Sequence, residues 1–192
     1  MKKKRICLLI VFGLLLIGIL VFSGTYAYFA WNSTGENKNA SVSVSSVNGQ
    51  GQCNKAADNE MILHPVSNRN NGRIITVNTR QTLSEYAYIT WTLTINSINT
   101  ATTETAGLKH QSFKYELVNT TTGESYGSGN FLGKDIGDTI SFSNNTELLP
   151  YNVTNYFTLY LWIDGTIGKN DNDILNQTYS FDLVCDITGA NV

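Results

Sequence analysis

The chain has 192 residues, of which 13 are basic and 15 are acidic. Residues 1–27 hold four of the basic side chains and none of the acidic ones, so residues 28–192 have a formal charge of −6. Nucleic acids and anionic lipid surfaces are bound by clustered Lys and Arg, so this balance argues against both as partners. The remaining length suits one domain. Its abundant Thr, Ser, Asn, Tyr and Gly favour strands and turns over helices.

The N-terminal segment has the layout of an export signal. Basic residues 2–5 precede an uncharged apolar run, residues 6–22, and the basic end of such a segment stays in the cytoplasm. Thr25 and Ala27 then occupy the −3 and −1 positions of a signal-peptidase site that would cut before Tyr28. The apolar run has 17 residues, which is longer than the usual signal core and close to the minimum for a spanning helix. An uncleaved membrane anchor is therefore the alternative interpretation.

Both interpretations place the rest of the chain outside the membrane, either extracellular or at the cell surface. The predicted organisation is a signal peptide or anchor over residues 1–27, a polar linker over 28–39 and a β-sandwich domain over 40–192. The membrane is then a partner only through residues 6–22, and signal peptidase is a partner during export.

The first strands are predicted from short alternating segments. Residues 40–47 alternate apolar and polar side chains, with Val42 and Val44 on the apolar face. Residues 52–72 have a loop-like sequence apart from the apolar residues 61–63. A second strand is expected over residues 73–78.

Residues 86–95 contain the clearest strand pattern. One face carries Ala87, Ile89, Trp91, Leu93 and Ile95, and the other carries Tyr86, Tyr88, Thr90, Thr92 and Thr94. Period-two alternation would scatter the apolar residues around a helix, whereas it gives a strand one buried and one solvent-exposed face. The exposed Tyr and Thr row has three open interpretations: carbohydrate stacking, an ordinary outer sheet face, or a surface covered by a neighbouring subunit.

The second half of the domain continues the strand pattern. Polar connections are expected at residues 96–107 and in the glycine-rich passage 126–133, and a hairpin turn is expected at 120–124. Four more strands are expected in this half. Their inward residues, strand by strand, are Phe113, Tyr115 and Leu117; Ile140 and Phe142; Phe157, Leu159, Leu161 and Ile163; and Tyr179, Phe181, Leu183, Cys185 and Ile187. The third of these strands would turn Tyr156, Thr158, Tyr160 and Trp162 outward. The predicted fold class is all-β, an antiparallel two-sheet β-sandwich preceded by an N-terminal hydrophobic export helix.

Two cysteines remain after the N-terminal segment. Cys53 and Cys185 form a pair that an exported chain could join in a disulfide. Cys185 is also in phase with the apolar face of its strand, where a buried free thiol is common. Both interpretations stay open at this point.

Residues for catalysis or metal binding are sparse. The two histidines, His64 and His110, lie far apart in loop-like stretches, and the His-Glu-x-x-His motif of zinc proteases is missing. The acidic loop at residues 164–173 lacks the ligand order and the closing Glu of a calcium-binding EF-hand loop. We therefore expect no catalytic residue, no metal site and no cofactor.

Two short segments resemble those of a known family. The sequence Gly24-Thr25-Tyr26-Ala27-Tyr28-Phe29, followed by the polar spacer and the 40–47 strand, is similar to the start of the TasA/camelysin proteins of Gram-positive bacteria. The segment Leu161-Trp162-Ile163-Asp164 and the strand over residues 179–187 extend the resemblance. The family consists of exported surface and biofilm-matrix proteins. The resemblance implies a jelly-roll-like sandwich, export through a dedicated signal peptidase and, in matrix members, assembly into fibres.

In such fibres the freed N-terminal segment of one subunit completes a sheet of the next. The residues that would serve this strand donation are Tyr28, Phe29, Trp31, Val42 and Val44, and the partners would be copies of the chain or related matrix subunits. The three aromatic residues would instead flank a membrane anchor if the leader were retained. A membrane-anchored adhesion or ligand-binding module is the alternative function. A camelysin-like metallopeptidase is retained only because of the family's name.

Overall fold

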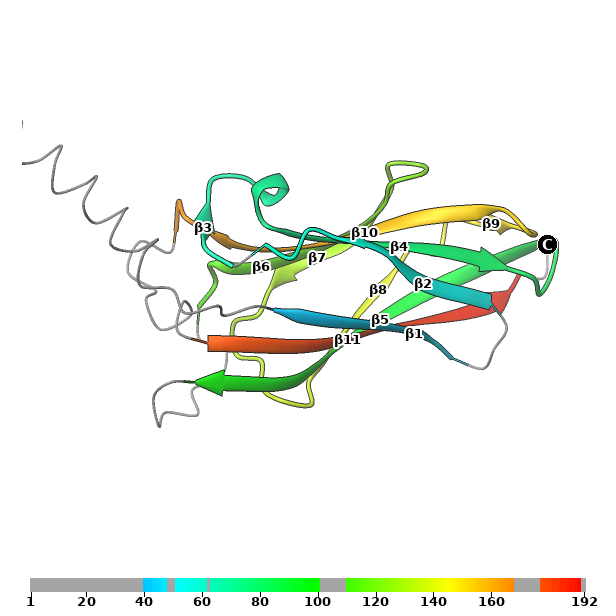
Figure 1. The fold of residues 1–192 in the computed structure, drawn as a ribbon. Helices are drawn as coiled ribbons and strands as arrows, with labels where there is room; N and C mark the ends of the chain where they lie inside the picture. The colour runs from blue at the N-terminus through cyan, green and yellow to red at the C-terminus, as the bar shows by residue number, and fades with distance from the viewer. Residues whose placement is uncertain (1–39, 48–50, 62, 101–109, 168–176, 191–192) are drawn as a thin grey trace, which may run out of the picture. The chain divides into compact units, whose positions relative to one another are not determined.

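The computed structural model describes residues 40–47, 51–61, 63–100, 110–167 and 177–190, which belong to one compact unit, Asn37–Val192 (Figure 1). The described residues form strands and one short 3₁₀ turn. The elements are β1 (Ser41–Ser46), β2 (Gly51–Asp58), β3 (Pro65–Val66), η1 (Arg69–Asn71), β4 (Arg73–Gln81), β5 (Tyr86–Thr100), β6 (Phe113–Asn119), β7 (Ser125–Asn130), β8 (Thr139–Ser143), β9 (Leu149–Pro150), β10 (Thr154–Asp164) and β11 (Gln177–Gly189). In this part of the chain no helix has the length and hydropathy needed to cross a membrane.

The strands form two sheets. Sheet A has the order β1-β11-β5-β8, and β9 also pairs with β5. Sheet B has the order β2-β4-β10-β6-β7, and β3 also pairs with β10. Successive strands often change sheet, because β1 belongs to sheet A and β2 to sheet B, and β4 belongs to sheet B and β5 to sheet A.

The two sheets share one apolar core, so the prediction of an all-β, two-sheet fold is confirmed. The inward residues predicted for β5, β10 and β11 are all buried, and they lie in one cluster with residues of β4, β6 and β8. Tyr115 of β6, also predicted to be inward, is only partly buried and packs against this cluster. Aromatic rings join the layers: the centroids of Trp91 and Phe157 are 5.2 Å apart, and those of Phe113 and Tyr179 are 4.9 Å apart. Such tilted ring pairs add to the stabilisation from buried apolar area.

Two predicted loops are strands in the structure. Residues 51–58 form β2 along the edge of sheet B, although Cys53 is the only fully buried side chain in that strand. Part of the glycine-rich passage forms β7, which pairs with β6 across the predicted turn. An edge strand that is exposed on both faces lacks the apolar alternation on which the prediction relied. Both loop predictions were wrong for this reason.

Three further expectations need correction. The ladder is not wholly antiparallel, because β1 pairs with β11 in parallel and β3 pairs with β10 in parallel. Strand β5 continues to Thr100 and so includes part of the predicted polar connection. Thr158 is buried rather than exposed, since Thr76 and Val118 lie directly beside it on the two neighbouring strands. Chain neighbours alone do not show this lateral shielding.

Candidate functional site at the edge of β1

Strand β1 lies at the edge of sheet A and pairs with one strand only. It pairs with β11 from Ser41, opposite Ser180, to Ser46, opposite Cys185. Val42 points into the core, and Val44 is partly buried against it. The sequence therefore predicted the strand and its inward residues correctly. A short edge strand with few core side chains is the part of a sheet most easily exchanged for another strand.

A disulfide joins β2 to β11, the strand with which β1 pairs. Cys53 of β2 is bonded to Cys185 of β11, with their Cα atoms 6.6 Å apart and a sequence separation of 132. The amide of Val47 donates to the carbonyl oxygen of Cys185 at 2.9 Å. The bond thus joins sheet B to sheet A at the residue beside which β1 ends. The sequence left this bond open because Cys185 is in phase with the apolar face of its strand, where a buried free thiol is equally common.

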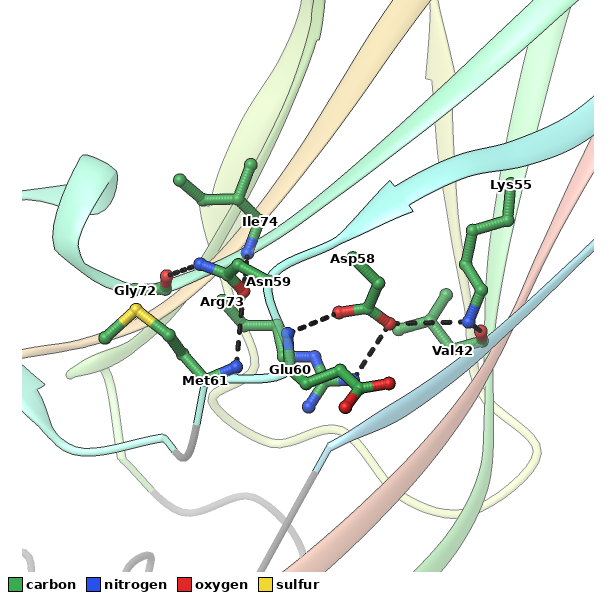
Figure 2. A network of polar contacts seen from close by, with 9 residues as sticks. All are labelled: Val42, Lys55, Asp58, Asn59, Glu60, Met61, Gly72, Arg73 and Ile74. Carbon is green, nitrogen blue, oxygen red and sulfur yellow. Dashed lines mark hydrogen bonds and ion pairs between the residues drawn. The ribbon is translucent and has the colours of Figure 1, made fainter.

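A polar network lies between β1, β2 and β4 (Figure 2). Asp58, the last residue of β2, accepts from Nη2 of Arg73, the first residue of β4, at 2.9 Å. The ammonium group of Lys55 donates to the carboxylate of Asp58 and to the carbonyl oxygen of Val42, each at 3.3 Å. Lys55 therefore connects β2 to a backbone acceptor of β1. The network therefore links the two edge strands, β1 of sheet A and β2 of sheet B.

Hydrogen bonds beside this network hold together the two ends of residues 59–72, which connect β2 to β4. The side chain of Asn59 accepts from the amides of Met61 and Ile74 and donates to the carbonyl oxygen of Gly72 at 2.9 Å (Figure 2). One amide side chain thus holds both ends of this connection. We call residues 59–72 the covering segment, because part of it lies over the outer side of β10 at Tyr160.

Burial and hydrogen bonding act in opposite directions on Asp58. Burial alone would raise the pKa of its carboxyl group, but hydrogen bonds from Arg73, from the amide of Glu60 and from Lys55 outweigh that effect and hold the pKa below its ordinary value. The guanidinium of Arg73 is almost fully buried, and its Nε and Nη1 atoms have no hydrogen-bond partner in the described part of the chain. Asp58 is thus the counter-charge on which this buried cation depends.

A second polar cluster, which the sequence did not reveal, lies beside the β6–β7 turn. One carboxylate oxygen of Glu147 accepts from Nδ2 of Asn119 at 2.9 Å and from Oγ1 of Thr122 at 2.6 Å. Burial, together with the nearby carboxylate of Glu147, raises the pKa of Tyr126 well above its ordinary value. The cluster attaches the turn to the segment before β9, and we assign it a structural role.

The other predicted residues fall into two groups. Ala27, Tyr28, Phe29 and Trp31 lie outside the described residues, so cleavage and strand donation stay predictions. Asp164, at the start of the acidic loop, accepts from Lys114 at 2.7 Å and from the hydroxyl of Thr166 at 2.6 Å. Within the described ranges, no group of three or more His, Cys, Asp or Glu side chains is arranged to hold a metal ion.

Comparison with known proteins adds no assignment. The sequence matches no protein-family model, and no curated protein matches it. The arguments for function therefore rest on the sequence and on the geometry described above.

Proposed function

We propose that the protein is an exported structural protein of the bacterial cell surface or the extracellular biofilm matrix. The observation that carries this proposal is the disulfide between Cys53 and Cys185. Disulfides persist in oxidising compartments and are rare in the reducing cytosol, so the bond agrees with the export signal in residues 1–27. The proposal assigns the protein no catalytic activity and no cofactor.

We further propose that the N-terminal hydrophobic export segment is helical, that the sandwich is jelly-roll-like, and that the protein assembles by strand donation. The linker over residues 28–39 leads directly into β1, which is bonded to its sheet along one side only. Released from its own sheet, β1 could pair with the same edge of another copy, with Val42 and Val44 filling the same apolar positions. Tyr28, Phe29 and Trp31 would add contacts on the acceptor subunit.

Export is tested by N-terminal sequencing and intact mass of the protein from culture supernatant. The proposal expects a chain that begins at Tyr28. Full-length protein in the membrane fraction would support the alternative function, a membrane-anchored adhesion or ligand-binding module. Full-length protein that is soluble in the cytoplasm would contradict both.

Assembly is tested by replacing residues 28–39 with a Gly/Ser sequence of equal length, which keeps the spacing and removes the aromatic side chains. The proposal expects the oligomers of the native protein to be lost in size-exclusion chromatography. The matched control replaces residues 101–107, another polar stretch, in the same way and should leave the oligomers intact. Unchanged oligomers in the first variant would show that Tyr28, Phe29 and Trp31 do not hold the assembly together, and would reject their part in strand donation.

A further inference from the structure

The outer face of sheet A has an unusual composition. Its outward side chains on β1, β5, β8 and β11 include Ser41, Ser43, Ser45, Tyr86, Tyr88, Thr90, Thr92, Thr94, Thr139, Ser141, Ser143, Thr178, Ser180, Asp182, Val184, Asp186 and Thr188. Most of them are Ser or Thr, and the set includes no Lys, Arg or His. We call these residues the hydroxyl face.

The strand register arranges these side chains in rows across the sheet. Thr94 lies between Thr139 of β8 and Asp182 of β11, and Asp182 lies beside Ser43 of β1. Thr92 lies in the same way between Ser141 and Val184. Neighbouring strands are about 4.8 Å apart, so each row presents closely spaced hydroxyl groups that can both donate and accept hydrogen bonds.

An aromatic and acidic patch lies at one end of the rows. Tyr86 and Tyr88 follow each other on the outward side of β5, and each is 37% exposed. Thr188 is opposite Tyr88, and Asp186 is opposite Thr90, which makes Asp186 the diagonal neighbour of Tyr88. Diagonal neighbours in a sheet are within reach of aromatic side chains. An aromatic face beside a carboxylate is a favourable environment for an organic cation.

We propose that the hydroxyl face binds a polysaccharide of amino sugars in which some amino groups are free. The rows of Ser and Thr match a polymer rich in hydroxyl groups, and the flat faces of Tyr86 and Tyr88 match its sugar rings. The ammonium groups are matched by Asp186, by the tyrosine rings and by the remaining acceptor capacity of Asp182, whose Oδ1 already accepts from the hydroxyl of Ser43. This charge pattern disfavours anionic polymers, because the face offers them no basic side chain. The inference concerns a ligand and does not depend on strand donation.

The experiment measures binding of soluble glucosamine oligosaccharides to the protein purified from culture supernatant, by isothermal titration calorimetry at low salt. Fully acetylated oligosaccharides of the same length and a neutral glucan serve as comparison ligands. We expect the glucosamine oligosaccharides to bind most tightly, with an affinity that falls as salt is added. Equal binding of the acetylated oligosaccharides, or no binding of the glucosamine oligosaccharides, would overturn the proposal.

Substitutions locate the site. Combining Tyr86→Ala with Tyr88→Ala should weaken binding roughly tenfold, because each exposed cation–aromatic contact contributes modestly and the two add. Asp186→Asn should weaken binding and reduce its dependence on salt. Tyr156→Ala is the matched control, since Tyr156 is a similarly exposed tyrosine on the outer face of sheet B. Equal losses in the control and in the double variant would mean non-specific attraction to an acidic protein, and would overturn the assignment.

Discussion

The outer faces of the two sheets differ, although both arise from the same strand alternation. The outer face of sheet A presents rows of small hydroxyl side chains. The outer face of sheet B carries larger and charged side chains that are paired, as in the ion pair of Lys114 with Asp164 and that of Glu116 with Arg69 of η1. The guanidinium of Arg69 also lies 4.7 Å from the ring centroid of Tyr160.

The covering segment explains part of this difference. It brings η1 over β10, and it begins and ends at the ion pair of Asp58 with Arg73. Large outward side chains such as Tyr160 and Trp162 thereby gain partners from a connection. Sheet A gains no such layer from the described residues, and its outward positions carry small polar side chains. A face is therefore open or covered according to its connections rather than its strands.

The largest expected effect comes from removing the bond between the sheets. Replacing both Cys53 and Cys185 by Ala should lower the free energy of unfolding by about 2–5 kcal/mol, because the bond closes a long loop in the unfolded chain. Urea unfolding followed by tryptophan fluorescence measures the loss. Reducing the native protein should reproduce it, and an unchanged urea midpoint in both experiments would contradict the prediction.

The next effect concerns the ion pair at the base of the covering segment. Asp58→Asn leaves the buried guanidinium of Arg73 without a counter-charge and should cost about 3 kcal/mol. Adding Arg73→Met should recover much of the loss, because the uncompensated charge is then removed. If the double variant is as unstable as the single one, the ion pair is not the cause.

The same pair predicts a pH dependence. The pKa of Asp58 is lower in the folded protein than in the unfolded chain, so its contribution to stability is complete above the unfolded pKa of about 4 and is lost as the pH falls through the folded pKa. Urea unfolding at a series of pH values should show the stabilities of the native protein and of Asp58→Asn converging below about pH 4. A constant difference down to the lowest pH would contradict this assignment.

A smaller effect tests the contact of the covering segment with β10. A Cβ atom at Gly72 would lie 2.6 Å from the carbonyl oxygen of Leu161 and 2.7 Å from Cβ of Trp162, so Gly72→Ala must displace the segment. We expect a loss of about 1–3 kcal/mol and faster proteolysis of residues 59–72. Asn70→Ala, an exposed change in the same segment, is the control and should have little effect. Equal stability of the two variants would mean that the covering segment can move away from β10 without loss of stability.

The smallest effect is expected on the hydroxyl face. Ser141→Lys replaces an exposed side chain and should change the free energy of unfolding by less than about 0.5 kcal/mol. Tyr160→Lys is the matched change on sheet B. It removes the contact with Arg69 and adds a like charge, so it should cost at least about 1 kcal/mol. A loss at Ser141 as large as that at Tyr160 would show that both faces are covered.

The sequence by itself determined the all-β class and the inward residues of the central strands. Ala87 to Ile95 and Phe157 to Ile163 alternate because each of these strands has one face against the core, and that pattern is local. The sequence also identified β1 and its valines. It left the pairing of the two cysteines open.

Only the tertiary structure decided the remaining features. Strand β2 shows no alternation of apolar and polar residues, because neither of its faces is fully covered. Its position is set by pairing with β4. The disulfide, the parallel pairing of β1 and the ion pair of Asp58 with Arg73 depend on segments that are distant in sequence. Local periodicity reports which face of a strand is buried, whereas the neighbour that buries it is chosen by the packing of the whole chain.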